Sequence, residues 1–459
     1  MRAVARFLLK AVTLFTLWAF IGACLYSIGT TLMARQSADS ASQMTLPQLA
    51  APLGEQLIEG NAVLVSKLTM APVDLEFDAE NVGYVLDEKG MVFRINETGG
   101  TDPVPWLVLS NDRTERTIPF RSMALHPGFL DTDSKGYGRL YTIEPEIAGT
   151  DRPDFVPEHG AEGTEHHQEV LCEYRTTDPR RRVFTGSRKV LARFSQPGGE
   201  NNVNDLAFDR LGRLFVAVGD GDAGKPGRNA ASRNAMSLLN AYGKVLRIDP
   251  LGDNSANGQY GIPPRNPFLV IDGALPEIWC YGLRDPQRLE FDPYRDWLSI
   301  VDLGQDGVEE LNISEVGGEH FGWDMCEGSF FYPPAKGRKP SDGGVRAPKA
   351  EFARQGGERA AGGFIYRGQS FPALRGRLLV ATSAGRILSA RFSSGQYEMA
   401  RLVVGNQREL AGNQITGIRP GPTGELFILT RSGGIYEMQK QTAAIGSRKA
   451  KKPLLCWAL

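Results

Sequence analysis

Short stretches in which apolar and polar residues alternate recur along this chain, separated by turns rich in Gly, Asp and Pro. This period-two pattern is typical of two neighbouring β-strands joined by a tight turn. Six such segments begin at Asp74, Ser122, Asp205, Arg288, Gly362 and Gly417. Six similar units spaced by tens of residues predict an all-β chain that forms a six-bladed β-propeller. A large β-sandwich is the alternative architecture.

Helical periodicity is confined to the N-terminus and the short stretch Arg233–Ala241. Residues Ala11–Ala34 carry no charge and are numerous enough for an apolar helix that spans a bilayer. Basic residues precede this run, so the positive-inside rule puts the rest of the chain outside the cytoplasm. We therefore expect export, periplasmic or extracellular, with residues 1–40 acting either as a membrane-attached signal anchor or as a cleaved signal peptide.

The remaining chain divides into a lead-in at residues 41–70, a propeller at residues 71–439 and a basic tail at residues 440–459. Two long segments interrupt the strand pattern. Glu144–Thr164 is polar and rich in Pro and Gly, and Tyr332–Ala361 mixes basic residues with Pro and Gly. Long loops of this kind are often functional. The basic segment is a candidate cover for an anionic ligand, with an ordinary surface loop as the alternative.

The formal net charge of the chain is −1, but both ends are basic. Residues 1–40 carry +3 and residues 440–459 carry +5, so residues 41–439 carry −9. An acidic body of this kind argues against nucleic-acid binding. The chain has five cysteines, too few for a disulfide scaffold. One bridge between Cys280 and Cys326 and a set of buried free thiols both stay open.

One acidic segment carries the densest candidate chemistry. Four carboxylates fall within nine residues, at Asp302, Asp306, Glu309 and Glu310. Carboxylates this close repel one another unless water or a cation intervenes, and Ca²⁺ binds carboxylate and carbonyl oxygens. Arg284 and Asp285 precede this segment on a loop before a predicted strand. The arrangement indicates a metal loop at the floor of a cofactor site, and a solvated acidic loop is the alternative.

Several phrases together resemble the glucose/sorbosone dehydrogenase family over roughly Ala71–Met438. They are MALHPGF from Met123, NDLAFDRLGRLFVAVGDGD from Asn204, GKVLRIDP from Gly243, EIWCYGLRDPQRLEFDP from Glu277 and DLGQDGVEELN from Asp302. The resemblance implies a six-bladed propeller that oxidises aldoses with pyrroloquinoline quinone (PQQ) and Ca²⁺. The DLGQ form also resembles the branch with hedgehog-interacting proteins, in which the propeller is a binding module.

The resemblance also implies roles for individual residues. Asn201 stands where the family has its catalytic histidine, and Asp220 stands where an aspartate orients that histidine. An amide can hydrogen-bond a sugar hydroxyl but cannot take its proton, and a positioned base supplies about 10²–10⁴-fold in rate. Asp220 is therefore a candidate base in its own right if burial favours its protonated form.

The cofactor positions implied by the resemblance are changed as well. Arg284-Asp285 replaces an Arg-Asn pair at the quinone, and PQQ carries carboxylates that Asp285 repels. Gln414 and Thr416 fall where the family has two arginines, which Arg419 on the same strand is a candidate to replace. Gly304 and Gln305 match the residues whose backbone carbonyls hold the Ca²⁺, and carbonyl ligation tolerates side-chain change.

Two functions follow. The first is a PQQ- and Ca²⁺-dependent sugar dehydrogenase with an altered pocket. The second is a non-catalytic, exported propeller that binds a sugar, a glycan or a protein, because Asn201, Asp285, Gln414 and Thr416 all depart from the enzymes. His320, His166 and His167 are interpreted as structural or surface residues rather than bases.

Overall fold

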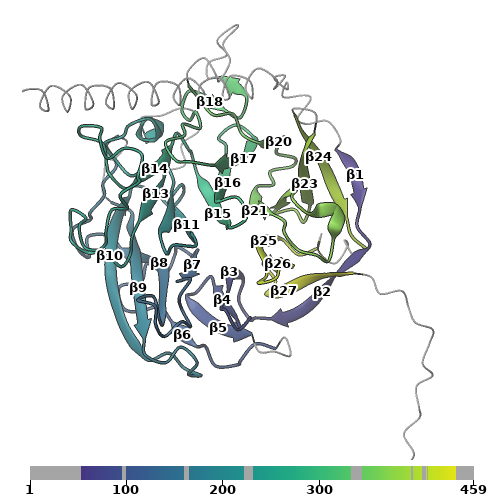
Figure 1. Cartoon of the computed structure of the whole chain (residues 1–459), viewed down its shortest axis with the longest axis horizontal. Coiled ribbons are helices and arrows are strands. Elements are labelled where there is room, and N and C mark those ends of the chain that lie inside the picture. The colour runs from purple at the N-terminus through teal and green to yellow at the C-terminus, as the bar shows by residue number, and fades with distance from the viewer. Residues whose placement is uncertain are drawn as a thin grey trace, which may run out of the picture.

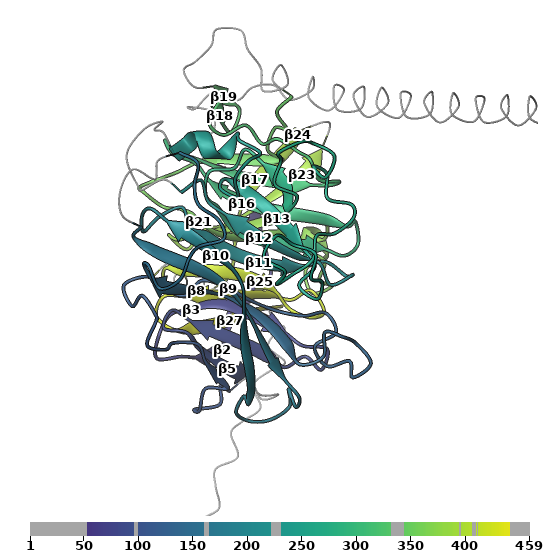
Figure 2. The same cartoon turned by 90° about the vertical axis from the view of Figure 1, so that its left-hand side faces the viewer.

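The protein is a ring of β-sheets in a computed structural model that describes residues 53–95, 100–159, 165–221, 231–331, 344–393, 396–405, 410 and 412–440. Six sheets of four or five strands lie around a central axis (Figure 1). The predicted all-β, six-bladed propeller is confirmed and the sandwich alternative is wrong. Figure 2 shows the strands running across the thickness of the ring, from one face to the other.

In each blade consecutive strands pair antiparallel, and the first strand lies nearest the axis. The first two blades consist of β3 (Pro72–Phe77), β4 (Gly83–Asp87), β5 (Met91–Ile95) and β6 (Leu107–Val108), then β7 (Met123–Leu125), β8 (Arg139–Ile147), β9 (His167–Thr176) and β10 (Gly186–Gln196). The next two consist of β11 (Val203–Phe208), β12 (Leu214–Val218), β13 (Lys244–Ile248) and β14 (Ile278–Tyr281), then β15 (Pro286–Asp292), β16 (Trp297–Leu303), β17 (Val308–Ser314) and β20 (Ala350–Ala353).

The last two blades are completed by strands from the beginning of the described chain. The fifth contains β21 (Ala360–Ile365), β22 (Leu378–Thr382), β23 (Ile387–Ser393), β24 (Gln396–Val403) and, parallel to β24, β1 (Gly54–Leu57). The sixth contains β25 (Ile415–Pro420), β26 (Leu426–Thr430), β27 (Gly434–Lys440) and β2 (Gly60–Lys67). The pairing of β2 with β27 joins the two ends of the described chain and closes the ring (Figure 1).

The six repeated sequence segments form the two innermost strands of the six blades, as the alternation predicts. In three of them a Phe-Asp pair ends or follows the inner strand, and the aspartate organises the turn. Asp78 accepts hydrogen bonds from the backbone N–H of Glu80 at 2.9 Å and Val82 at 3.0 Å. Asp209 accepts from the N–H of Leu211 and Arg213 in the same way. Side-chain capping of this kind satisfies turn N–H groups locally and fixes the hairpin.

The apolar core lies between neighbouring blades. Between the first two blades, Tyr84, Trp106 and Phe129 pack edge to face, with ring centroids 5.0 Å apart for Tyr84–Trp106 and 5.7 Å for Tyr84–Phe129. Such contacts bury large aromatic areas and fix the angle between adjacent sheets.

Several finer predictions have different outcomes. The proposed Cys280–Cys326 bridge is wrong, because Cys172, Cys280 and Cys326 are buried free thiols. The helical stretch Arg233–Ala241 is reduced to the 3₁₀-helix η1 (Ala231–Ala235), and a second, η3 (Pro372–Leu374), precedes β22. The basic segment after Tyr332 is more than a loop, since it supplies β20, while β18 (Cys326–Glu327) and β19 (Phe330–Phe331) form a small hairpin before it.

The predicted N-terminal apolar helix and the basic tail after residue 440 lie outside the described residues. Within the described residues, no helix combines the length and apolar character needed to cross a membrane.

Candidate functional site

Four of the predicted site positions meet at one face of the ring. Asn201 precedes β11, Asp220 follows β12, Arg284 precedes β15 and Gly304 follows β16. The start of a first strand and the end of a second strand lie at the same edge of an antiparallel meander, so all four reach this face. A continuous chain of bonds joins them, from Asn201 Nδ2 to Asp220 Oδ1 at 2.9 Å, from Asp220 N to Arg284 O at 2.8 Å, and from Arg284 Nη1 to Gly304 O at 3.2 Å.

The Asn201–Asp220 pair is buried and held from both sides. Asn201 has a φ of 52°, in the left-handed region that Asn tolerates better than most residues. Its exposed fraction is 3%, and Asp220 is fully buried. The indole Nε1 of Trp323 donates to Asp220 Oδ2 at 2.8 Å. Each oxygen of the carboxylate thus accepts a hydrogen bond, one from Asn201 and one from Trp323.

Sequence reasoning missed the residues behind this pair. Asn234 Nδ2 donates to Asp220 O at 3.0 Å, and the buried Lys244 Nζ donates to the carbonyls of Asn234 at 2.7 Å and Ala235 at 3.2 Å. Burial lowers the pKa of Lys244 to about 7, and Asp220 partly opposes this shift. Lys244 stands in the phrase GKVLRIDP, which is the signal that could have found it.

Arg284 and Asp285 are fixed by Asp302, at the end of β16. The backbone N–H of Arg284 donates to Asp302 Oδ2 at 3.0 Å, and that of Asp285 donates to Asp302 Oδ1 at 2.7 Å. Asn204 and Gln287 each donate a side-chain amide to Asp285 Oδ1 at 2.8 Å. Asp285 therefore has neutral partners, and its carboxylate is locked in the wall of the site.

Guanidinium groups surround the carbonyl that the family resemblance assigns to Ca²⁺. Gly304 O accepts a hydrogen bond from Arg284 and another from Arg354, whose guanidinium also pairs with the buried carboxylate of Glu309. The Gln305 side chain accepts from Arg284 Nε at 2.8 Å. Among the described residues no group of three or more His, Cys, Asp or Glu side chains is arranged to hold a metal ion. This arrangement does not fit a divalent cation on Gly304 O.

Two other carboxylates near this loop have raised pKa values because they are buried. The pKa of Asp302 is about 8, since burial outweighs its two backbone N–H donors, and the pKa of Glu309 is about 7 in spite of Arg354. Glu327 accepts from the N–H of Asp306 at 2.8 Å and Val308 at 2.7 Å and so shapes the loop after Gly304. Three of the four carboxylates of the acidic segment, Asp302, Glu309 and Glu310, are therefore buried and accept from backbone N–H groups, an arginine or an amide, whereas Asp306 is exposed.

A sequence profile described as "Glucose / Sorbosone dehydrogenase" matches residues 157–437, more than half of the chain. The chain belongs to the glucose/sorbosone dehydrogenase family. The matched range holds all the predicted site positions, and it confirms the family resemblance of the sequence phrases.

Curated relatives come from both branches suggested by those phrases. The HIPL1 protein of Arabidopsis thaliana is 30% identical over 362 residues, covering 67% of this chain and 50% of the relative. The aldose sugar dehydrogenase YliI of Escherichia coli is 28% identical over 232 residues, covering 49% and 56%. Human hedgehog-interacting protein is 23% identical over 366 residues, covering 76% and 47%. The chain thus spans about half the length of these relatives.

Solved structures of the family share the fold. The crystal structure of the soluble aldose sugar dehydrogenase of Escherichia coli in its apo-form has a TM-score of 0.61 at 21% identity, covering 83% of this chain and all of that one. The PQQ-bound aldose sugar dehydrogenase of Streptomyces coelicolor has a TM-score of 0.56 at 18% identity, covering 85% and 99%. At these identities the likeness concerns the propeller alone.

The remaining predicted cofactor residues of this family member do not join the bonded chain around Asn201. Gln414 is exposed before β25, and Thr416 Oγ1 donates to the carbonyl of Pro72 at 2.7 Å. Arg419 is buried near the ring axis, where it donates to Asp74 Oδ1 at 2.7 Å and Asp205 Oδ1 at 2.8 Å. Arg419 is thus committed to ion pairs between inner strands and is not available to replace the family's arginines.

The three histidines interpreted from the sequence contact other side chains of the protein. His320 stacks on Tyr281 with ring centroids 4.6 Å apart, and its Nε2 lies 3.0 Å from Met236 Sδ. Burial lowers the pKa of His320 to about 4, so it is a weak base. His166 Nδ1 lies 3.0 Å from His167 Nδ1, and His167 Nε2 lies 3.2 Å from Glu169.

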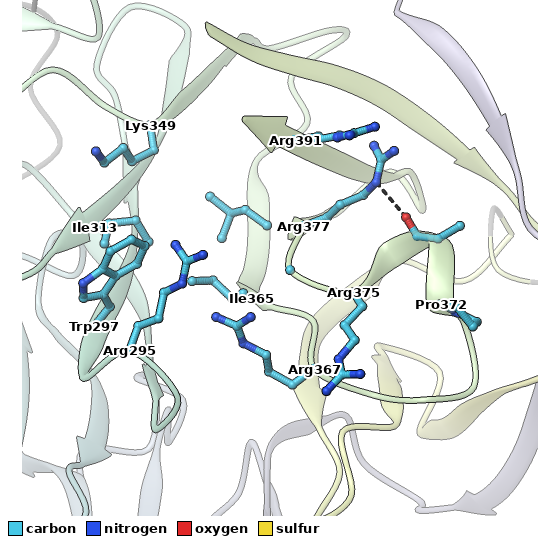
Figure 3. A pocket seen from close by; sticks show the side chains of 13 residues that line it. Arg295, Trp297, Ile313, Lys349, Ile365, Arg367, Pro372, Arg375, Arg377 and Arg391 are labelled. Atoms are coloured by element: carbon cyan, nitrogen blue, oxygen red, sulfur yellow. Dashed lines mark hydrogen bonds between the residues drawn. The ribbon is translucent and has the colours of Figure 1, made fainter. Parts of the chain in front are cut away.

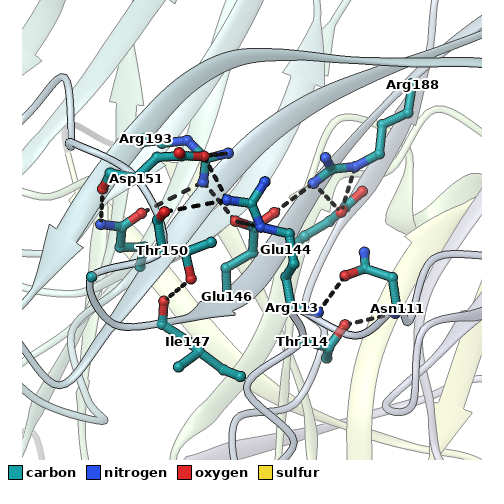
Figure 4. A network of polar contacts seen from close by, with 12 residues as sticks. Asn111, Arg113, Thr114, Glu144, Glu146, Ile147, Thr150, Asp151, Arg188 and Arg193 are labelled. Atoms are coloured by element: carbon teal, nitrogen blue, oxygen red, sulfur yellow. Dashed lines mark hydrogen bonds and ion pairs between the residues drawn. The ribbon is translucent and has the colours of Figure 1, made fainter.

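Ion pairs also fix the rim of this face at the end of β8 (Figure 4). The buried Glu146 accepts from Arg188 Nη2 at 2.8 Å and Arg193 Nη1 at 2.6 Å, and Arg188 also bonds Glu144 at 2.8 Å. Arg113 reaches Glu146 at 3.8 Å and Asp151 at 2.6 Å. The charges at this rim are therefore paired within the protein, as they are around Gly304.

Proposed function

We propose that this protein is an exported, non-catalytic member of the glucose/sorbosone dehydrogenase family that binds a carbohydrate. The observation that carries the proposal is the pair of guanidinium groups bonded to Gly304 O. A divalent cation beside Arg284 and Arg354 would be strongly repelled, because like charges at contact distance interact by several kcal/mol even at a moderate dielectric constant.

The acid–base chemistry of the cluster supports the same conclusion. The Asn201 amide donates to Asp220 and carries no basic nitrogen. The carboxylate of Asp220 also accepts from Trp323, and both side chains are buried. A general base must reach the proton that it abstracts, and this pair is directed inward.

The face of the ring that carries the Asn201 cluster is suited instead to binding a sugar. Carbohydrate hydroxyls are recognised by planar amides, carboxylates and arginines, which donate and accept in fixed directions. Arg121 at the start of β7 donates Nη1 to Asn204 Oδ1 at 3.1 Å, and its Nε is buried with no partner among the described residues. Arg121 is therefore a candidate contact for a ligand oxygen.

Export is part of the proposal and rests on the basic start and uncharged run of residues 1–40. The hedgehog-interacting relative is named for a protein partner, so a protein ligand on the same face is the alternative outcome of a binding experiment.

The decisive experiment adds PQQ and Ca²⁺ to the purified protein, removes free cofactor by desalting, and assays aldoses with an electron-accepting dye. We expect no retained quinone absorbance and no dye reduction. Tight quinone binding by the wild type would refute the non-catalytic assignment.

Sugar binding needs its own readout. A glycan array followed by calorimetry should identify a ligand, and Arg121→Gln should weaken its binding about tenfold or more, because a hydrogen bond to a charged donor contributes roughly 1.5–3 kcal/mol. Asn201→Gly is the matched variant that keeps the left-handed backbone while removing the amide. The absence of any signal on the glycan array would overturn carbohydrate binding and leave a protein as the ligand to test.

A second candidate, a PQQ-dependent sugar dehydrogenase, is favoured by one geometric feature. Residue 201 and Asp220 are bonded to each other at 2.9 Å, the relation that the family resemblance requires of the base and its orienting aspartate. In this case Asp220 would be the residue that accepts the proton. Dye reduction by the wild type that is abolished in Asp220→Asn supports this function.

A further inference from the structure

A basic pocket of about 710 Å³ lies between the fourth and fifth blades (Figure 3). It is lined by six cationic side chains, Arg295, Lys349, Arg367, Arg375, Arg377 and Arg391. Arg295 and Lys349 come from the fourth blade, and the other four arginines come from the fifth. Figure 3 shows these side chains around a common space, with Trp297 forming part of one wall. No acidic residue is among the lining residues.

The pocket opens on the face of the ring opposite to the Asn201 cluster. Trp297 begins β16 and Gly304 follows its end, so the two sites lie at opposite ends of one strand, about 20 Å apart at roughly 3.3 Å per residue. The turns after the inner strands β15 and β21 contribute to the pocket, whereas the Asn201 cluster lies before inner strands and after second strands, at the other edge of the blades. The pocket and the Asn201 cluster are therefore separate sites.

Part of the positive charge is left without a counter-charge. Arg367 pairs with Asp292, and Lys349 Nζ lies 3.3 Å from Glu315. Arg377 Nε donates to the carbonyl of Ala373 at 2.8 Å, which does not neutralise its charge.

Two further arginines, Arg375 and Arg391, are exposed and form no ion pair within the described ranges, although Glu398 on β24 lies opposite Arg391. Burial and the positive charge of Arg391 lower the pKa of Arg377, and Glu398 only partly opposes this shift, so the two guanidinium groups repel each other. Arg295 lies over the Trp297 ring, 4.5 Å from its centroid, which fixes one wall of the pocket. Nearby carboxylates therefore relieve only part of the repulsion among the cationic side chains of the pocket.

We propose that this pocket binds a small soluble ligand with at least two phosphate or sulfate groups, such as a phosphorylated or sulfated sugar. Guanidinium groups bind tetrahedral oxyanions through paired N–H donors, and several around one cavity select multiply charged ligands. A volume of about 710 Å³ suits a small molecule, since ligand pockets range over roughly 300–1,000 Å³. Trp297 offers an apolar surface for a sugar ring.

The overall charge favours a compact ligand over an extended polyanion. Residues 41–439 carry −9, so the positive pocket is a local exception on an acidic body. A long nucleic acid or polysaccharide would meet repulsion beyond the pocket, whereas a small ligand stays within it.

The test measures binding of myo-inositol hexakisphosphate and sucrose octasulfate to the full chain by calorimetry, with sodium sulfate at equal ionic strength as reference. We expect one site per chain for at least one of the two polyanions and no saturable binding of sulfate. The double variant Arg375→Gln/Arg391→Gln should weaken binding at least about tenfold, since each removes a charged hydrogen-bond donor.

The matched control is Arg180→Gln/Arg182→Gln, which removes the same charge from exposed pairs with Glu80 and Asp102. Affinity within about twofold of wild type supports the pocket, because exposed ion pairs contribute little. Equal losses in the two double variants would mean non-specific attraction and overturn the proposal. Absence of polyanion binding, or binding only to vesicles that contain phosphoinositide, overturns it as well. Binding of only one of the two polyanions supports the proposal and shows whether the pocket recognises phosphate or sulfate groups.

Discussion

The two ends of β16 place arginines in opposite circumstances. At the Gly304 end, Arg284 and Arg354 are bonded to carbonyls, to Gln305 and to the buried Glu309. At the Trp297 end, Arg375 and Arg391 belong to a pocket without acidic lining and are exposed. The first pair of arginines stabilises the fold, because its positive charge is matched by oxygen atoms inside the protein. The second pair adds to the repulsion among the cations of the pocket, and this incompletely compensated charge indicates a ligand.

The Asn201 cluster occupies the family's catalytic positions in the sequence. In the folded protein, however, its donors and acceptors are largely bonded to other protein groups. Unsatisfied charge is the better indicator of ligand binding, because buried or crowded charges are costly unless a partner is supplied.

Removal of a fully paired arginine should be strongly destabilising. Arg419→Met leaves Asp74 buried at the axis without a cation and Asp205 with Arg288 alone, and it should lower the free energy of unfolding by about 3–5 kcal/mol. Urea denaturation followed by tryptophan fluorescence measures this loss. Arg375→Met is the control, and a loss of similar size there would erase the difference between the two kinds of arginine.

Removal of Arg354 should both destabilise the loop and change its response to metal. Arg354→Gln takes the charged partner from Glu309 and one donor from Gly304 O, at a cost of about 2 kcal/mol. We expect millimolar Ca²⁺ to raise the Tm of this variant and to leave that of the wild type unchanged, as measured by differential scanning fluorimetry. Arg346→Gln, which breaks the half-exposed pair with Glu315, serves as control. A calcium-dependent rise in the wild type would contradict the fit argued for Gly304.

Stability should fall as the pH rises from about 5 to 8. Asp302 and Glu309 have pKa values of about 8 and 7 in the folded protein, above those of an unfolded chain. The folded state therefore binds more protons in this range, and each group contributes stability that is present at low pH and lost as pH rises through its folded pKa, on the order of 1–2 kcal/mol. Thermal unfolding between pH 5 and 8.5 measures the slope. Glu309→Gln should flatten it, whereas an unchanged slope would show that Glu309 does not titrate.

The smallest effect is expected in the basic pocket. Arg391→Gln removes an exposed charge that repels Arg377 and should change the free energy of unfolding by no more than about 0.5 kcal/mol, towards stability. Added salt should stabilise the wild type slightly more than this variant, because screening relieves the same repulsion. A marked loss of stability would mean that Arg391 has a structural role.

Much of the architecture was predictable from local pattern. The alternation of apolar residues and the turns rich in Gly, Asp and Pro predicted six hairpins, and their number and similarity predicted the ring. Convergence of Asn201, Asp220, Arg284 and Gly304 followed from their places at strand ends. The Cys280–Cys326 bridge was wrong because a spacing in sequence does not fix the distance between two thiols in different strands.

The partners of the site side chains were not predictable. Arg354 lies fifty residues after Gly304 in a segment interpreted as a loop, and only the pairing of β20 with β17 brings it to that carbonyl. Arg419 shares a strand with Thr416 but faces the axis, where inner strands of other blades supply Asp74 and Asp205. The basic pocket has no motif, because its six cations come from two blades.

Local alternation and turn chemistry are therefore enough to predict the repeating unit, the family and the edge of the ring at which its characteristic positions meet. Which charges neutralise one another is visible only in the folded protein, because the pairing of two charges depends on their distance in space. In a propeller that distance is often set by neighbouring blades.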